Sequence, residues 1–290
     1  MILLAERTRP VLRYPPILIL PALGWFLTFL IVPVSIVMLY SVATKGLYGS
    51  VVFRFTTENY VRAVDWIYLR IFWNSLSLAT LTAVSSLLIG YPMAYVMATA
   101  QPKLRTLLLG LIVIPFWTNL VVRTYALKVL LGTMGPVNGV ALAMGLISEP
   151  YDFSNTDLSV WFGMVTNYLP FMVLPLYVAL EKFDFSLIEA ARDLGASSFQ
   201  ILIRILFPLT KPGIVTGLIF VFTPALGEFV IPDLLGGART MLVGNLITEQ
   251  FLKTRDWPFG SALSLLLILV VMGSLLIYLR LGEGSEESSA

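Results

Sequence analysis

Long stretches of apolar residues alternate with short polar segments along this chain. Six of the stretches reach about the 20 residues that an α-helix needs to cross a hydrocarbon core roughly 30 Å thick. They lie near residues 17–42, 71–98, 104–131, 160–181, 212–234 and 259–281. Transmembrane barrels show short segments of alternating apolar and polar residues instead. The pattern predicts an all-α, polytopic membrane protein with six transmembrane helices.

Proline residues interrupt four of these stretches. They are Pro33, Pro115, Pro170, Pro175, Pro224 and Pro232. Each removes a backbone donor and favours a kink, and neighbouring helices can satisfy the freed carbonyl groups. The prolines are therefore either ordinary features of membrane helices or signs of bent helices that line a path. A further apolar segment, 137–147, is too short to span and is predicted to be an interfacial helix.

Composition narrows the possible functions. The chain is 58% hydrophobic and 12% charged, whereas soluble domains carry about 25% charged residues. The net charge of +2 gives no reason to expect nucleic-acid binding. The sequence contains no Cys and no His, which excludes disulfides, a Ser/His dyad and histidine-ligated zinc or haem. It also lacks a glycine-rich phosphate loop, so we expect no metal and no cofactor in this chain.

Basic residues near the N-terminus suggest an orientation. Arg7, Arg9 and Arg13 precede an apolar run that is too long for a cleaved signal peptide. The basic residues of the whole chain divide almost evenly between the two sides, but the N-terminal cluster and the turn at 101–105 favour cytoplasmic termini. We expect a cytoplasmic segment over 1–16, one transmembrane domain over 17–281, and a disordered acidic tail over 282–290.

A polar segment at 182–211 separates the fourth and fifth stretches. Ser186 and Glu189 have the spacing of a capping box. Gly195 lies where a helix would need a left-handed C-cap. The sequence predicts a short helix that ends there, with Leu187, Ala191 and Leu194 on one face. A second short helix is expected to start at Ser198 and to end before Pro208.

These residues are consistent with a role only in starting and ending helices, but their spacing over the whole loop fits a known motif. Glutamate and two alanines are followed by glycine, isoleucine and proline six, sixteen and nineteen positions after the glutamate. The residues are Glu189, Ala190, Ala191, Gly195, Ile205 and Pro208. The pattern resembles the EAA loop of ABC-importer permeases, and it departs from that loop only at Phe207, where the family prefers leucine.

The resemblance implies that the first short helix is a coupling helix held in a groove of an ATPase subunit. Ala190 and Ala191 would allow close approach, and Gly195 would permit the turn. The implied partners are a second homologous permease, two copies of an ABC ATPase and an extracytoplasmic substrate-binding protein. ATP and Mg would be bound by the ATPase, so this chain would not be an enzyme. The implied location is the bacterial inner membrane.

Further segments resemble the spermidine/putrescine-type branch, and the resemblance extends from the first span to about residue 281. They are 117–126, 224–238, 244–245 and 257–261. The branch implies a translocation path for polyamines, although similar permeases carry opines or other small organic solutes. An ion-coupled secondary transporter remains a rival, because it would explain buried charges in the spans. It would leave the loop at 182–211 unexplained.

Glu228 is the candidate carboxylate within the spans. A charged residue there costs about 2.5–3.5 kcal/mol on insertion scales and usually faces a cavity or a partner. Glu228 either lies in the path of a cationic substrate or pairs with a basic group such as Arg123. Asp233 is a second candidate carboxylate nearer the outer mouth.

Aromatic and polar side chains complete the set of candidate path residues. They are Trp117, Asn119, Tyr125, Phe222 and Phe229. Aromatic rings contribute about 0.5–2 kcal/mol each through cation–π contacts, and their alternative role is packing or interfacial anchoring. Asn119 shares a helical face with Arg123, and an arginine on the path would favour an anionic or zwitterionic substrate.

Overall fold

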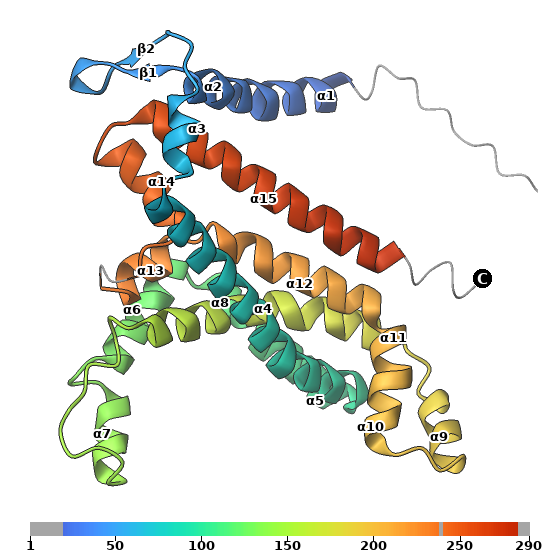
Figure 1. Cartoon of the computed structure of the whole chain (residues 1–290). Helices are drawn as coiled ribbons and strands as arrows, with labels where there is room; N and C mark the ends of the chain where they lie inside the picture. The colour runs from blue at the N-terminus through green and yellow to red at the C-terminus, as the bar shows by residue number, and fades with distance from the viewer. Residues whose placement is uncertain (1–19, 238–239, 284–290) are drawn as a thin grey trace, which may run out of the picture.

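The computed structural model describes residues 20–237 and 240–283 (Figure 1). The predicted cytoplasmic segment 1–16 and most of the predicted tail 282–290 lie outside the described residues. The first span comprises α1 (Leu20–Phe26), the π-helical turn η2 (Leu27–Ile31) and α2 (Val32–Ser41). A small hairpin follows, with β1 (Thr44–Lys45), the 3₁₀ turn η3 (Leu47–Gly49) and β2 (Val51–Val52), which pairs antiparallel with β1.

Helices form the regular structure of the rest of the described chain. The first group is α3 (Glu58–Ala63), α4 (Trp66–Thr99), α5 (Pro102–Val113), η4 (Ile114–Trp117), α6 (Leu120–Leu131), α7 (Pro136–Ala143) and α8 (Asp157–Glu181). The second group is α9 (Ser186–Asp193), α10 (Ser198–Ile201), η5 (Leu202–Leu206), α11 (Phe207–Leu209), α12 (Lys211–Leu226), α13 (Val230–Leu235), α14 (Val243–Leu252) and α15 (Trp257–Glu283).

Five stretches of the described chain are long and apolar enough to cross a membrane. They are Leu20–Ser41, Trp66–Thr99, Leu120–Ala143, Asp157–Glu181 and Trp257–Tyr278. A sixth is the pair Ser198–Leu209 and Lys211–Leu226, which bends by 73°. This agrees with the predicted all-α membrane fold. The segment expected to be an interfacial helix, 137–147, contributes to α7, which continues the apolar run of α6.

The predicted span 104–131 is broken near Pro115, one of the prolines expected to favour a kink. The chain leaves the α-helix after α5, makes the 3₁₀ turn η4, and begins again as α6. Pro115 lies in η4 and lacks the N–H that would continue the helical hydrogen bonds. The side-chain oxygen of Asn119 accepts a hydrogen bond from the N–H of Val121 at 2.8 Å and so caps the new helix.

The predicted span 212–234 is also interrupted. It consists of α12 and α13, which are separated at residues 227–229. Pro224 lies inside α12, and Pro232 lies inside α13, so neither proline marks the interruption itself. The physical reason is the side chain of Glu228, whose contacts are described below.

The core of the molecule is built from α4, α8 and α12, which cross one another at the centre of Figure 1. Small residues let the helices approach closely, as is usual between membrane helices. Gly217 of α12 is one example, because a Cβ atom there would lie 2.6 Å from the sulfur of Met172 on α8. The buried side chains Ala79 and Ala83 of α4 join the same cluster. These three helices form the scaffold to which the other elements attach.

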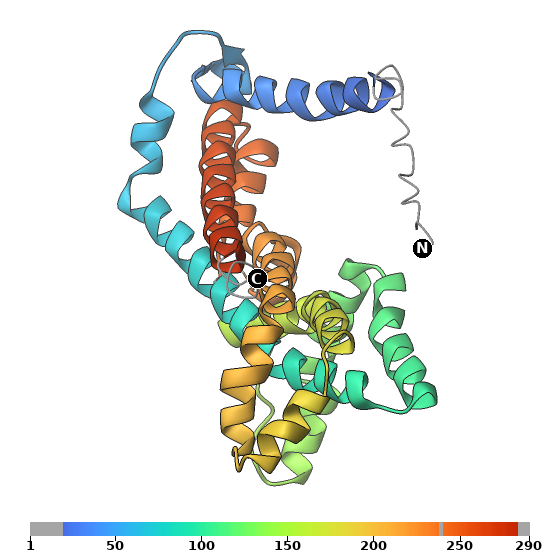
Figure 2. The same ribbon diagram turned by 90° about the vertical axis from the view of Figure 1, so that its right-hand side faces the viewer.

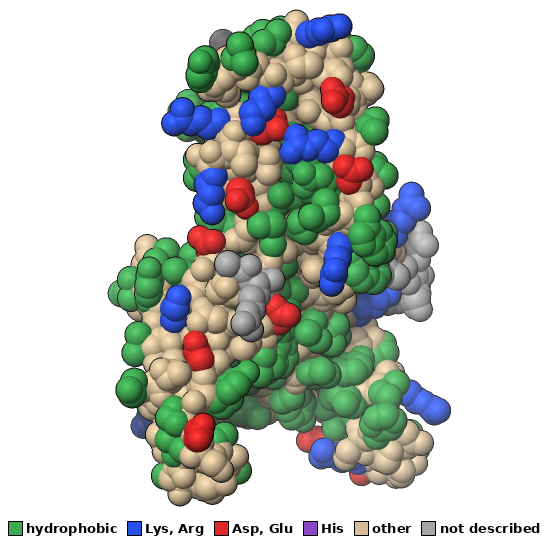
Figure 3. Space-filling model, turned by 60° about the vertical axis from the view of Figure 1, so that its left-hand side comes forward, with side chains coloured by type: hydrophobic (Ala, Val, Ile, Leu, Met, Phe, Trp, Pro, Cys, Tyr) green, Lys and Arg blue, Asp and Glu red, His purple; other side chains and the backbone are tan. Residues whose placement is uncertain are grey.

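The first span lies at the side of this scaffold. None of the apolar window within Leu20–Ser41 is buried, and α2 packs against α15. Figures 1 and 2 show that the described start of α1 and the end of α15 lie on the same side of the molecule as α9 and α10. Figure 3 shows large apolar areas on another face, interspersed with side chains of both charges.

An ion pair joins elements on the side of the molecule opposite α9 and α10. Asp256, just before α15, is 5% exposed and accepts a hydrogen bond from Arg62 of α3 at 2.9 Å. The guanidinium carbon of Arg62 lies 3.9 Å from the ring centroid of Phe259. Lys45 of β1 lies 3.8 Å from the same carboxylate and donates a hydrogen bond to the carbonyl oxygen of Thr254. The hairpin, α3 and the start of α15 are therefore joined by one carboxylate.

Candidate functional site

The helix α9 lies in the loop that resembles the EAA motif, but it does not start as predicted. Ser186 makes no side-chain cap and has no capping box with Glu189. Asp184 instead accepts a hydrogen bond from the N–H of Ser186 at 3.0 Å. Hydrogen bonds from Ser186 lower the pKa of the Asp184 carboxyl below its ordinary value. An acidic residue two positions earlier thus takes the capping role, and the side chain of Glu189 remains exposed.

The end of α9 agrees with the prediction. Gly195 has a φ of +81°, which is the left-handed conformation that glycine adopts at a helix C-terminus. The N–H of Ala196 donates to the carbonyl of Ala191 at 3.0 Å, and that of Gly195 donates to Arg192 at 2.9 Å. This pair of bonds is a Schellman motif, which turns the chain towards α10.

The second helix of the loop starts at Ser198 as predicted, but it ends later than predicted. Its N-cap is Ser197, which forms a reciprocal capping box with Gln200, with bonds of 2.8 and 3.3 Å. The helix does not end before Pro208. The π-helical turn η5 carries it into α11, which contains Pro208, because wider hydrogen-bonded turns accommodate a residue that lacks an N–H. The sequence signal for the cap was the spacing of Ser197 and Gln200.

The face of α9 that packs inward is centred on Ile188. Ile188 is buried, with Phe185 and Ala191 packed beside it against the core. Leu194 is 89% exposed and Leu187 is 43% exposed, so of the three residues expected on one helical face only Ala191 packs against the core. Ala190 remains on the exposed surface. Buried Ile201 and Leu206 anchor the second half of the loop.

The loop joins the scaffold through a buried hydroxyl pair. Thr210 lies between α11 and α12, where the chain bends. Its hydroxyl donates to the carbonyl of Leu206 at 2.6 Å and lies 3.0 Å from the hydroxyl of Tyr91 on α4. The ring of Tyr91 also packs edge-on against Phe207, with centroids 4.9 Å apart. The bend is thus attached to the longest helix of the molecule.

Glu228 fills the interruption between α12 and α13. It is 7% exposed. One carboxylate oxygen accepts hydrogen bonds from the N–H groups of Phe229, Val230 and Ile231, at 3.0, 2.8 and 3.3 Å. The other oxygen accepts a hydrogen bond from the hydroxyl of Tyr168 on α8. The described residues place no ion-pair partner within 4.0 Å of Glu228, so the expected pair with Arg123 is not formed.

The other candidate path residues come together only in part. Asp233 and Phe229 line a cavity of about 220 Å³ with Asn245 and Glu249. Phe222 is 3% exposed and packs edge-on against Tyr278. Three residues lie elsewhere, at the start of α6 or just before it. They are Asn119, which caps that helix, Trp117, which is 90% exposed, and Tyr125, which is 53% exposed.

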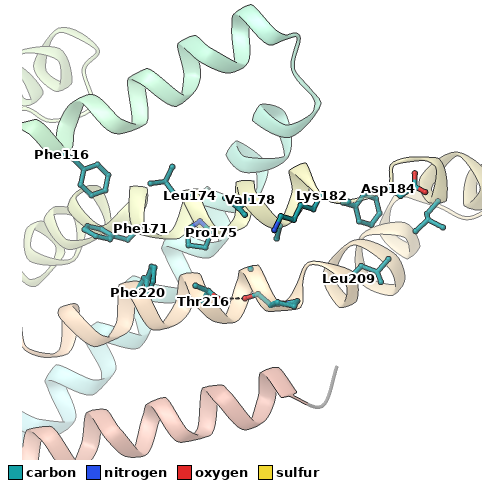
Figure 4. A pocket seen from close by; sticks show the side chains of 15 residues that line it. Phe116, Phe171, Leu174, Pro175, Val178, Lys182, Asp184, Leu209, Thr216 and Phe220 are labelled. Atoms are coloured by element: carbon teal, nitrogen blue, oxygen red, sulfur yellow. Dashed lines mark hydrogen bonds between the residues drawn. The ribbon is translucent and has the colours of Figure 1, made fainter. Parts of the chain in front are cut away.

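Aromatic residues that the sequence analysis did not select line a larger groove. It has a volume of about 880 Å³ and lies between α8 and α12. Phe116, Phe171 and Phe220 gather at one end, and Lys182 and Asp184 lie at the other, beside α9 (Figure 4). The rings of Phe116 and Phe171 are 4.9 Å apart in an edge-on arrangement. The signal in the sequence was phenylalanine beside proline within a span, at residues 115–116 and 170–171.

These sites are suited to binding other molecules and to conformational change. In the described ranges no three His, Cys, Asp or Glu side chains are grouped closely enough to hold a metal ion. The exposed part of α9 offers a surface for a protein partner, and the groove offers an apolar, aromatic lining. The groove ends at α9, so these two features are adjacent.

Comparison with known proteins identifies the family. Residues 86–283 match the family described as the binding-protein-dependent transport system inner membrane component. The spermidine/putrescine transport system permease protein PotB of Haemophilus influenzae is 45% identical over 257 residues, covering 89% of this chain and 90% of the relative. The protein of the same name in Escherichia coli K12 is 43% identical over 263 residues, covering 91% and 96%.

Solved structures share the fold at low sequence identity. A chain of a bacterial ABC transporter involved in the import of the acidic polysaccharide alginate superposes with a TM-score of 0.70 at 20% identity, covering 92% of this chain and 94% of that one. A chain of the MetNI methionine ABC transporter in an inward-facing conformation gives 0.56 at 18%, covering 76% and 96%. This chain therefore belongs to the family of binding-protein-dependent transport system inner membrane components.

Proposed function

We propose that this chain is the permease subunit of an ATP-driven importer that carries polyamines of the spermidine/putrescine class across the inner membrane. The observation that carries the proposal is the similarity to PotB proteins over about nine-tenths of both chains. Opines and other small organic solutes are the alternative cargo of the same machine. The loop of α9 to α11 disfavours an ion-coupled transporter, because such a protein has no use for an ATPase-binding surface.

In this proposal the ATPase binds the exposed surface of α9. Glu189 and Ala190 are exposed, Gly195 turns the chain, and Ile205 and Pro208 shape the second helix. Together with Ala191 they form the coupling surface. The loop is anchored in the core, so a force on α9 reaches the spans. The ATPase binds ATP and Mg, and this chain catalyses no reaction itself.

The further partners in this proposal are a second homologous permease, two ATPase copies and an extracytoplasmic binding protein. Both termini lie in the cytoplasm. Support for this orientation is the position of the described ends on the side of α9. Movement of the ATPase then shifts the population between inward-open and outward-open states, which requires that the two states bind the ATPase differently.

The path itself runs along the aromatic groove and the outer cavity. Asp233 and Phe229 would meet the substrate at the outer end, and Trp117, Asn119 and Tyr125 would contact it from α6 and the turn before it. The groove is apolar, which suits the methylene segments of a polyamine, and its phenylalanine rings suit ammonium groups. Glu228 and Phe222 are buried within the chain, and we propose that they shape the path from behind.

The test is substrate-stimulated ATP hydrolysis by the reconstituted complex. The complex would be assembled from this chain, its second permease, the ATPase and the binding protein in liposomes. Putrescine, spermidine, an opine and an amino acid would be supplied in turn. We expect stimulation and uptake with the polyamines. If the opine alone stimulated ATP hydrolysis, opines would replace polyamines as the proposed substrate class. Uptake without ATP would overturn the ATP-driven mechanism.

A further inference from the structure

At the interruption of the fifth span, backbone N–H and C=O groups lose their helical hydrogen-bond partners. Other donors and acceptors must bind these groups, and most membrane helices do not provide them. α12 has 16 residues and extends about 24 Å at 1.5 Å per residue, so the interruption lies about that far from the bend at Thr210. Glu228, within the interruption, is 7% exposed, and unpaired backbone groups away from water cost several kcal/mol each. One oxygen of Glu228 binds three N–H groups there. The side chain therefore makes the interruption possible.

The second oxygen of Glu228 serves a different purpose. It accepts the hydroxyl of Tyr168, which belongs to α8 and lies 60 positions earlier in the chain. This contact joins the interruption to the scaffold. α14 supports the same point, because the amide of Asn245 donates to the carbonyl of Phe229 at 2.8 Å. A Cβ atom at Gly244 would lie 2.8 Å from the carbonyl oxygen of Glu228, so the two backbones are in close contact.

α13 packs on α8 through small residues. A Cβ atom at Gly163 would lie 2.6 Å from Leu235 and 3.1 Å from Ile231. The hydroxyl of Ser159 donates to the carbonyl of Leu235 at 3.0 Å. These contacts involve backbone atoms or apolar surfaces. In the described part of the chain, the contact of Tyr168 with Glu228 is a hydrogen bond between two side chains, and it joins α8 to the linker that leads into α13.

The surroundings of Glu228 also bear on its role. Its two oxygens already accept hydrogen bonds from four donors of the chain itself, and the residue is 7% exposed. A substrate ammonium group would have to reach the second oxygen, which is buried and already accepts the hydroxyl of Tyr168. The first oxygen, with three N–H donors, is suited to fixing the backbone.

We propose that Tyr168 and Glu228 are positioning residues that hold α13 against α8, and that release of this contact opens the outer end of the path. The part of the proposal that concerns transport rests on the proposed function. The residues that move with α13 include Asp233, which lines the outer cavity together with Phe229. The contact would thus control access to that cavity without touching the substrate.

The first experiment measures the contact of α13 with α8 directly. The chain contains no cysteine, so Leu235→Cys introduces a single thiol at a position that is fully buried. The assembled complex is treated with a membrane-impermeant maleimide. Tyr168→Phe and Glu228→Ala should each raise the labelling rate by about tenfold, because a hydrogen bond to a charged group contributes about 1.5–3 kcal/mol. Unchanged labelling in both variants would overturn the proposal.

Matched variants separate this effect from general loosening. Tyr278→Phe also removes a tyrosine hydroxyl, but in α15, away from α13, and it should leave the labelling of Leu235→Cys unchanged. Glu228→Gln retains an acceptor for the three N–H groups but loses the charged acceptor of Tyr168, so its labelling rate should rise less than that of Glu228→Ala. Equal acceleration in all variants, Tyr278→Phe included, would indicate global destabilisation and would contradict the proposal. The labelling rate does not depend on which solute is carried. The experiment can therefore support the positioning role even if polyamines are not the substrate.

The second experiment separates positioning from substrate binding. Uptake and ATP hydrolysis are measured in the reconstituted complex with Tyr168→Phe and Glu228→Gln. Positioning predicts an unchanged KM in both variants and, for Tyr168→Phe, a severalfold fall in the solute carried per ATP hydrolysed. A cation ligand predicts a tenfold or larger rise in KM for Glu228→Gln with Tyr168→Phe unaffected. That second result would overturn the assignment of Glu228 as a positioning residue.

Discussion

The hydroxyl groups of Tyr91 and Thr210 lie 3.0 Å apart, and both residues are buried. Thr210 uses its own proton to bind the carbonyl of Leu206, so Tyr91 is the donor in this pair. The contact joins α4 to the 73° bend before α12. A force on α9 therefore reaches the scaffold at two kinds of contact, the apolar packing of the loop and this one polar bond.

We expect Tyr91→Phe to weaken the attachment of the bend. Loss of a buried neutral hydrogen bond costs about 0.5–1.5 kcal/mol, and Thr210 keeps its bond to Leu206. The midpoint of thermal unfolding of the purified complex should fall. Tyr95→Phe is the control, because Tyr95 lies one turn further along α4 and its hydroxyl makes no hydrogen bond in the described part of the chain. An equal fall in both variants would contradict the role of the hydroxyl pair.

Gly195→Val should uncouple ATP hydrolysis from transport. A left-handed conformation costs a residue with a Cβ atom about 1–2 kcal/mol, and Gly195 has a φ of +81°. No atom lies within 4 Å of a Cβ atom built there, so the cost arises from the backbone and not from a clash. The ratio of substrate-stimulated to basal ATP hydrolysis reports the effect.

Gly195→Asn is the matched variant, because asparagine adopts the left-handed conformation more readily than other residues with side chains. It should retain most of the stimulation. A normal response of the valine variant, in a complex that contains its ATPase, would show that the turn at Gly195 does not transmit the signal.

Gly163→Ala should destabilise the packing of α13 on α8. The added methyl group would lie 2.6 Å from Leu235, and overpacking costs about 1–3 kcal/mol. Gly110→Ala provides the comparison, since Gly110 lies inside α5 with no atom within 4 Å of the added group. Alanine favours a helix by about 1 kcal/mol over glycine, so this variant should unfold at a higher temperature. Opposite shifts are expected, and two shifts of the same sign would refute the packing assignment.

Asp256→Asn should loosen the junction of the hairpin, α3 and α15. Asparagine can still accept the hydrogen bond from the N–H of Phe259, which Asp256 accepts at 3.3 Å, so the change removes the charge and the oxygen that binds Arg62 while keeping this bond. Arg62 is 41% exposed, and solvent screening limits the expected loss to about 1 kcal/mol. Thermal unfolding at low and high salt measures it. The exposed Glu149→Gln should have no effect, and an equal loss in that variant would point to net charge instead of the ion pair.

The parts of the fold that follow from local sequence were predictable. A run of about 20 apolar residues is a property of adjacent positions, and the spacing from Glu189 to Pro208 can be read along the chain. The start of α9 was harder, because Asp184 and Ser186 both have side chains suited to capping and only the folded chain shows which one accepts the bond.

The interruptions of the spans could not be located from proline alone. Pro115 marks the first one closely, but Pro224 and Pro232 lie inside the helices on either side of the second. Its position depends on a carboxylate that reaches three N–H groups and on Tyr168, which lies far away in the sequence. Glu228 was correctly selected as unusual, and its charge was explained by the backbone and not by Arg123.

The packing of α2 against α15 has a consequence for the synthesis of this protein. The ribosome delivers α2 before α15. More than 200 residues are added between these two helices, and during that time α2 lies in the lipid without this partner. The apolar surface of α2 is compatible with hydrocarbon throughout that period. The contact between α2 and α15 therefore forms only after the spans between them have been made.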